Sequence, residues 1–111
     1  MFKLAFDIEG KQNHEEMSKI CWQNKGGCSF LNNGKLYQCT TAGHFHHLSK
    51  YFNINIYPTE KDYVDIYKVK SGKEIMEYLN RVIPFCKYYN IKNQVSDLDF
   101  EISKKELSEW L

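Results

Sequence analysis

The 111-residue sequence lacks a long apolar run and an excess of either charge. No stretch approaches the roughly 18 apolar residues that a membrane span requires. Lys and Arg number 15 and Asp and Glu number 14, which argues against the basic surfaces that bind nucleic acids or anionic membranes. The amino-terminal stretch carries charge at Lys3, Asp7 and Glu9, unlike a signal peptide. We therefore expect a cytoplasmic protein that has neither nucleic acid nor membrane as a partner.

Cysteine is also too scarce for a disulfide scaffold. The chain has four Cys, whereas disulfide-rich domains contain more than roughly 8–10% Cys. In a reducing compartment, cysteines are more often metal ligands, catalytic groups or core residues than disulfides. The chain shows no internal repeat, no low-complexity segment and no domain boundary, and its length is that of one domain, residues 1–111.

Hydrophobic periodicity predicts a small α+β domain. Apolar residues alternate with polar or small ones over residues 2–9, which indicates a half-buried amino-terminal strand. Further expected elements are a loop or short helix at 11–19, a β-hairpin at 28–39, a helix at 41–53 and a strand at 63–69. A second helix is expected after the capping pair Ser71 and Glu74, with Ile75, Leu79 and Val82 facing inward. An irregular stretch at 90–99 follows, and a last helix should run from the capping pair Ser103 and Glu106 to the end. The fold therefore combines an amino-terminal strand, a hairpin and three to four short helices.

The hairpin is the clearest local signal. An Asn-Gly pair at 33–34 between apolar runs favours a type I′ turn, in which both central residues take positive φ. This turn sets Phe30 opposite Tyr37, and the same register sets Cys28 opposite Cys39. Directly opposed residues share one face of a ribbon. The hairpin therefore predicts two thiols side by side at its open end.

The four cysteines form the main chemical candidate. Thiolates bind zinc or iron–sulfur clusters, and four of them complete either site. The gaps between Cys21, Cys28, Cys39 and Cys86 are six, ten and forty-six residues, so the paired Cys-x2-Cys knuckle of ordinary zinc ribbons is absent. Buried, inert core cysteines are the alternative. Spacing alone leaves the two interpretations evenly balanced.

Several segments resemble a known family. Cys21-x12-Gly34-x4-Cys39 fits the signature that opens the SPASM and twitch auxiliary-cluster domains found at the carboxyl end of many radical SAM enzymes. The words around residues 33–42 and 84–89 are also similar to family segments, and the similarity spans about residues 2–110. One departure is that Tyr89 stands where the family has a further cysteine after Cys86.

The resemblance implies an iron–sulfur cluster, of 4Fe–4S type, bound by Cys21, Cys39 and Cys86. We add Cys28 as the fourth ligand because the hairpin register places it across from Cys39. The chain lacks the Cys-x3-Cys-x2-Cys motif that radical SAM catalysis requires, so we expect no catalysis by this chain alone. The resemblance implies a radical SAM catalytic domain, in cis or in trans, as its partner. A peptide or small molecule would be the substrate of such an oxidoreductase.

The expected role is electron transfer or substrate anchoring by the cluster. Two alternatives from another class remain: a zinc-stabilised interaction domain on the same thiols, and a metal-free interaction domain. Among the histidines, His44, His46 and His47 flank an apolar helix stripe, and we expect solvated or supporting roles more than ligation. The carboxylates, Asp62 and Asp65 among them, are assigned to solvated faces.

Overall fold

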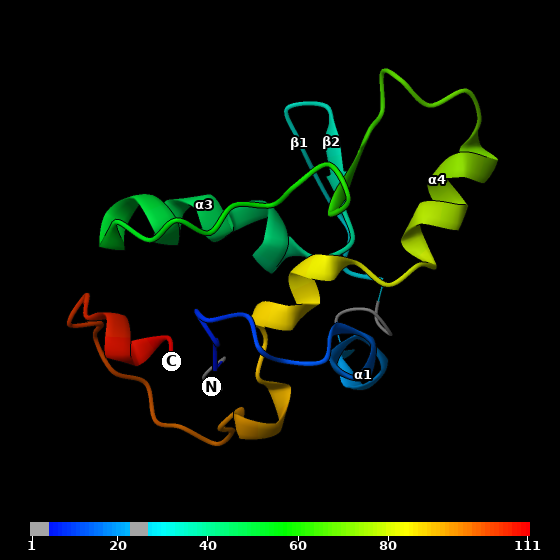
Figure 1. Ribbon diagram of the computed structural model, residues 1–111. Coiled ribbons are helices and arrows are strands. Elements are labelled where there is room, and N and C mark those ends of the chain that lie inside the picture. The colour runs from blue at the N-terminus through cyan, green and yellow to red at the C-terminus, as the bar shows by residue number, and fades with distance from the viewer. Residues whose placement is uncertain (1–4, 23–26) are drawn as a thin grey trace.

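Three short strands form an antiparallel sheet in the order β1-β2-β3 (Figure 1). In this computed structural model, which describes residues 5–22 and 27–111, the strands are β1 (Phe30–Asn32), β2 (Lys35–Tyr37) and β3 (Tyr63–Asp65). Asn33 and Gly34 both have positive φ, 51° and 74°, as a type I′ turn requires. Phe30 pairs with Tyr37. The predicted hairpin register is therefore confirmed for the strand residues.

Three helices accompany the sheet in the described residues: α1 (His14–Ile20), α3 (Thr40–Phe52) and α4 (Gly72–Leu79). The side chain of Asn13 caps α1 by accepting from the amides of Glu15 and Glu16, both at 3.1 Å. Helix α3 follows the hairpin directly, and its carboxyl-terminal cap is Asn53, whose φ is 54°. The predicted α+β class is confirmed, and the helix expected at 41–53 lies within one residue of its predicted ends.

Helix α3 packs against the hairpin through a glycine. A Cβ at Gly43 would overlap the ring of Phe30 and lie 3.2 Å from the ring of Tyr37. The absence of a side chain therefore allows the strands β1 and β2 to approach the helix closely. This contact fixes where the first turn of α3 lies relative to the sheet.

The core is aromatic. Phe45 on α3 lies 5.1 Å from Phe6 and 5.3 Å from Phe85, ring centre to ring centre, in edge-on geometry. Phe85 belongs to the 3₁₀ turn η1 (Pro84–Tyr88), and Tyr89, directly after it, lies 5.3 Å from Phe6. Figure 1 shows η1 beneath α3, with α1 beside it. The core therefore joins the amino-terminal segment, α3 and η1.

The expected amino-terminal strand is wrong for the part that the structure describes; residues 1–4 lie outside it. Over residues 5–9 the only ladder contact between described residues is an isolated bridge between Phe6 and Tyr89. The Phe6 amide donates to Trp110 O at 2.8 Å. The carboxylate of Asp7 then accepts from the amides of Glu9 and Lys11, both at 3.0 Å. This side-chain capping turns the chain and ends the extended stretch.

The expected carboxyl-terminal helix is also wrong. Only a 3₁₀ turn, η3 (Leu107–Glu109), forms. Ser103 Oγ does not cap a helix but donates to Glu109 Oε2 at 2.6 Å. Lys105 adopts a positive φ of 60°, which no helix interior contains. Between η2 (Ile91–Asn93) and η3 the chain has no helix, as expected for 90–99.

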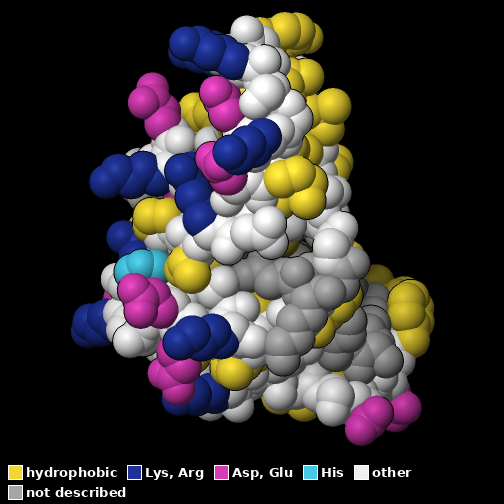
Figure 2. All heavy atoms as spheres, turned by 90° about the vertical axis from the view of Figure 1, so that its right-hand side faces the viewer, with side chains coloured by type: hydrophobic (Ala, Val, Ile, Leu, Met, Phe, Trp, Pro, Cys, Tyr) yellow, Lys and Arg dark blue, Asp and Glu magenta, His cyan; other side chains and the backbone are white. Residues whose placement is uncertain are grey.

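Two smaller corrections concern the sheet and α4. Strand β3 ends at Asp65, earlier than expected, because Asp65 Oδ1 accepts from the amide of Tyr67 at 3.0 Å and starts a turn. Ser71 precedes α4 but makes no side-chain capping bond. The buried side chain of this helix is Tyr78, while Val82 is exposed. Figure 2 shows the mixed surface of this end of the molecule, where apolar side chains lie among both kinds of charge.

The length and hydrophobicity of the helices decide whether any of them could span a membrane. Among the described residues, no helix is both long enough and apolar enough to cross a bilayer.

Candidate metal centre

Cys39 lies at the junction of β2 and α3. It is the residue that caps α3, and its Sγ accepts from the amide of Ala42 at 3.4 Å. Its side chain is 6% exposed. Burial raises the pKa of the Cys39 thiol, and the nearby Cys21 raises it further. The position of this thiol is set by neighbouring residues in the sequence, because α3 begins directly after β2 of the hairpin.

Cys86 lies in the turn η1, far along the chain from Cys39. It is 7% exposed, and its amide donates to Ile83 O at 3.2 Å. Burial, with Cys39 and Cys21 next in order, raises the pKa of the Cys86 thiol to about 12. Each of the three thiols Cys21, Cys39 and Cys86 thus comes from a separate segment, and Cys21 and Cys39 are near enough to contribute to the raised pKa of Cys86.

Two buried polar side chains hold these segments in place. Gln38, next to Cys39, donates from Nε2 to Tyr78 O at 2.6 Å and to Arg81 O. Its Oε1 is buried and has no partner among the described residues. Gln38 thus ties the end of β2 to the end of α4, directly before the turn that carries Cys86.

Asp62 provides the second anchor. It is 2% exposed, and its Oδ1 accepts from the amide of Phe85 at 2.8 Å. Its Oδ2 accepts from Thr59 N at 2.7 Å and Thr59 Oγ1 at 3.0 Å, and Tyr78 OH donates to its backbone oxygen at 2.6 Å. The assignment of Asp62 to a solvated face is therefore wrong. A buried carboxylate is stable only when hydrogen-bonded in this way.

Tyr89 lies beside the thiols. Its hydroxyl is 3.9 Å from Cys39 Sγ. Burial, followed by the proximity of Cys39, raises the pKa of Tyr89 well above its usual value. At the position where the resembling family has a further thiol, this chain therefore places a neutral phenol within reach of a candidate ligand sulfur.

The upstream cysteines are less buried. Cys21 follows α1 directly as its carboxyl cap and is partly exposed, as is Cys28. The strand ladder ends at Phe30 opposite Tyr37, so the expected pairing of Cys28 with Cys39 lies beyond it. The reason is a turn in which Ser29 N donates to Gly27 O at 2.9 Å. Cys28 is not among the main groups that shift the pKa of Cys39 or Cys86.

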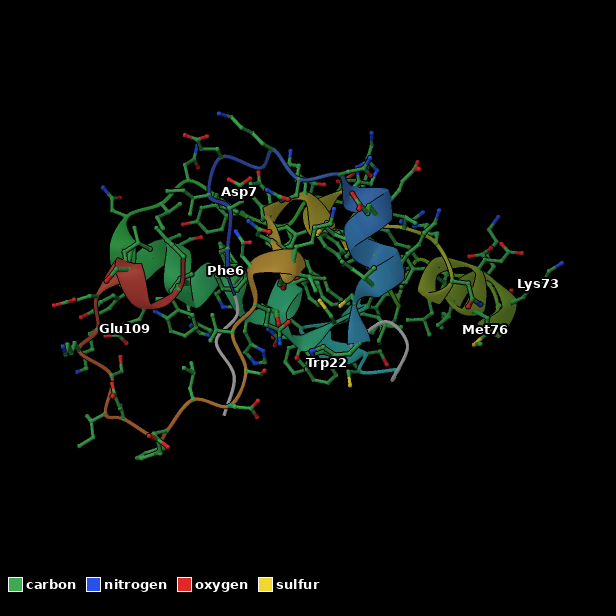
Figure 3. All side chains as sticks on the ribbon, turned by 90° about the horizontal axis from the view of Figure 1, so that it is seen from below. Phe6, Asp7, Trp22, Lys73, Met76 and Glu109 are labelled. Carbon is green, nitrogen blue, oxygen red and sulfur yellow. The ribbon has the colours of Figure 1, made fainter. Side chains whose placement is uncertain are left out.

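The thiols are not arranged as a closed ligand set. Within residues 5–22 and 27–111, no three His, Cys, Asp or Glu side chains form a metal-binding group. Figure 3 shows sulfur atoms, in yellow, between α1 and the start of α3, with Trp22 at the end of α1. In kind and in chain topology the donor set fits a thiolate-ligated metal or cluster. Closing it requires the thiols to lose their protons and move together.

The three histidines lie along the solvent side of α3. His44 Nδ1 lies 2.9 Å from Thr40 O, and its ring is 4.3 Å from that of Phe30. The rings of His46 and His47 are 3.9 Å apart. Burial, together with His47, lowers the pKa of His46. None of these contacts reaches a thiol, which agrees with supporting or solvated roles.

Sequence reasoning did not find Gln38, Asp62 or the role of Tyr89. No local pattern distinguishes these residues from surface polar residues, since their partners are 40, 23 and 50 positions away along the chain. Comparison with protein families, with curated proteins and with solved structures finds no significant match to this chain.

Proposed function

We propose that this chain binds an iron–sulfur cluster through Cys21, Cys28, Cys39 and Cys86 and acts as an auxiliary-cluster domain. The observation that supports the proposal is that the thiols of Cys21 and Cys39 contribute to the raised pKa of Cys86, although the three come from the end of α1, the start of α3 and η1. In a reducing compartment, cysteines are more often metal ligands, catalytic groups or core residues than disulfides, and the donor set here is of the kind that a metal site uses. The site belongs in the reducing cytoplasm, where these thiols stay free.

The four cysteines would have different roles in binding the cluster. Cys39 and Cys86 are held by buried elements, so they would define the position of the cluster. Cys21 and Cys28 are partly exposed and would provide the remaining two ligands. The cluster, when bound, supplies one-electron transfer or an open iron that anchors a substrate group.

The surroundings of Cys39 suit a ligand sulfur. The Ala42 amide donates to Cys39 Sγ, and the Tyr89 hydroxyl lies beside it. Hydrogen bonds to ligand sulfur tune cluster potential. The partner we propose is a radical SAM catalytic domain, in cis or in trans, which would act on a peptide or small molecule. The proposed role for this chain is electron transfer or anchoring, with no catalysis of its own.

Anaerobic reconstitution with iron and sulfide tests the cluster. We expect a brown protein that binds about four iron and four sulfide per chain, as a 4Fe–4S cluster requires. Cys86→Ser is expected to lose most of this iron. Lys87→Ala, on the same turn, is the matched control and should retain it. Cys28→Ser tests the fourth ligand separately.

Three outcomes contradict the cluster. A colourless product without iron supports a metal-free domain. Zinc that copurifies at one per chain and is not displaced during reconstitution supports a structural zinc site on the same thiols. Equal iron in wild type and Cys86→Ser removes Cys86 from the site.

A further inference from the structure

A strand-like segment near the carboxyl end has no sheet to join. Over residues 97–102 acidic and apolar residues alternate, in the order Asp97, Leu98, Asp99, Phe100, Glu101 and Ile102. This period of two is that of a β-strand. Asp97 itself has a positive φ of 58°, so the stretch that can extend as a strand is residues 98–102. Phe100 is 84% and Ile102 87% exposed. We call residues 97–102 the acidic segment.

The acidic segment is unpaired in its backbone and in its charges. Its backbone groups form no hydrogen bond with another described residue. Neither do its three carboxylates form an ion pair with any part of the chain that the structure describes. An exposed stretch of this kind is a template for pairing with a sheet edge.

A matching edge lies elsewhere on the same chain. Strand β3 pairs only with β2, so its other side is an edge of the sheet. Beside it lies a groove of about 320 Å³, lined by Lys35, Lys68, Arg81, Val64 and Val69 together with Tyr63, Glu60 and Asp65. The three cations outnumber the two carboxylates and form no ion pair within the described residues. We call this the β3 groove.

The two surfaces lie far apart on one molecule. In Figure 1 the acidic segment runs along the lower edge between η2 and η3, while the sheet lies in the upper half. In Figure 3 the carboxyl-terminal stretch lies on the side opposite α4, whose end leads to Arg81. A contact between them therefore joins two copies of the chain.

We infer that the acidic segment of one copy adds as a strand to the β3 groove of a second copy. In this contact Asp99 and Glu101 face the cationic side of the groove, which Lys68 and, from β2 across β3, Lys35 form, and Phe100 on the opposite side of the strand covers apolar surface of the groove. Five extended residues span about 17 Å, enough to pass the whole of β3. The proposal rests on neither the cluster nor its ligands.

The symmetry of the contact has a consequence. Donor and acceptor surfaces differ, so the contact is head-to-tail and each copy can bind two others. Association should build up with protein concentration instead of stopping at a dimer, unless a ring closes. Because charges contribute, it should weaken as salt rises.

Sedimentation equilibrium of the full chain in reductant, with and without bound iron, tests the inference. We expect the mean mass of the wild type to rise above that of the monomer towards millimolar concentration. The segment variant, Asp99→Lys with Glu101→Lys, should need at least about tenfold more protein, since like charges then meet in the groove. The groove variant, Lys35→Glu with Lys68→Glu, should show the same loss.

An equimolar mixture of the two variants gives the decisive reading, because each then offers the other a complementary surface. Association in the mixture should return to the wild-type range. Glu9→Lys with Glu15→Lys makes the same change in net charge as the segment variant, on exposed side chains of the amino-terminal region, and should associate as the wild type does. A monomeric wild type, variants that associate normally, or a mixture that stays monomeric would overturn the inference.

Discussion

The downstream cysteines and the upstream cysteines differ in how firmly the fold holds them. Cys39 and Cys86 are buried in the core, and their neighbours Gln38 and Phe85 are hydrogen-bonded to distant segments. Cys21 and Cys28 are partly exposed, one at the end of α1 and the other ahead of β1.

This difference indicates which of the proposed ligands the fold holds in place before any metal binds. Packing in the aromatic core positions half of the proposed ligand set, whether or not a metal is bound. The other two, Cys21 and Cys28, lie near the surface at the ends of elements, where small backbone movements cost little free energy. For the proposed cluster, the fold would hold two thiols in place beforehand, and the other two would complete the ligand set on binding.

The largest effect is expected from Phe85, which carries the turn of Cys86. Its side chain is 1% exposed and packs on Phe45 and Tyr88 with ring centres 5.3 and 5.2 Å apart. Phe85→Ala removes these contacts and leaves a cavity, so we expect the free energy of unfolding to fall by about 3–5 kcal/mol. Urea denaturation measures this value.

Phe100→Ala is the matched control, because it makes the same change at an exposed site. It should alter the free energy of unfolding by less than about 0.5 kcal/mol. Similar losses in the two variants would break the comparison, because Cys86 would then lie in a turn that the core does not hold.

The second effect concerns thiol reactivity in the metal-free protein. Alkylation needs the thiolate, and burial holds the pKa of Cys86 at about 12. We therefore expect Cys86 to react at least about a hundredfold more slowly in the folded than in the denatured protein at pH 8. Cys21 and Cys28, being partly exposed, should be modified first. Iodoacetamide labelling followed by peptide mass spectrometry gives the order.

Asp62→Ala tests whether the hydrogen bond to the Phe85 amide protects the Cys86 thiol from labelling. It removes the acceptor of the Phe85 amide and should loosen the turn, so that Cys86 labels faster while the rate at Cys21 is unchanged. Asp65→Ala, at a partly exposed position, is the control and should leave both rates as they are. Cys86 labelling as quickly as Cys21 in the wild type would contradict the pre-positioned pair.

Sequence reasoning was successful where short-range rules decide. The Asn33-Gly34 turn fixes its own register through two positive φ angles, and the helix from Thr40 to Phe52 follows from its apolar stripe. It was wrong where distant partners decide. Asp62 is buried only because the amide of Phe85, 23 residues away, comes to it.

The carboxyl-terminal helix shows the same limit. The capping pattern at Ser103 and Glu106 is genuine as a sequence motif, but the Ser103 hydroxyl bonds to the side chain of Glu109. The amide of Lys104 also donates to Glu109, at 2.6 Å, so these local side-chain bonds compete with a helix and the chain forms a 3₁₀ turn. For the site, the four cysteines could be singled out as candidates from the sequence, whereas the buried groups next to Cys39 and Cys86, Gln38 and Asp62, could not.

The smallest effect is a pH dependence of stability that belongs to the downstream pair. A thiol has an ordinary pKa of 9.0, and Cys86 in the folded chain has a pKa of about 12. Above pH 9 the unfolded chain therefore releases a proton that the folded chain keeps, so stability is full below pH 9 and is lost as pH rises towards 12. The loss due to Cys86 amounts to about 1 kcal/mol per pH unit in this window.

Tyr78 and Tyr89 also have raised pKa values and act in the same direction, so the test must isolate Cys86. Urea denaturation of the wild type and of Cys86→Ala at several pH values from 8 to about 10.5 provides the difference. The free energy of unfolding of Cys86→Ala should decline less steeply above pH 9, whereas Phe100→Ala should run parallel to the wild type. Parallel curves for wild type and Cys86→Ala would mean that the Cys86 thiol ionises as readily in the folded chain as in the unfolded one, and they would contradict the effect of burial on its pKa.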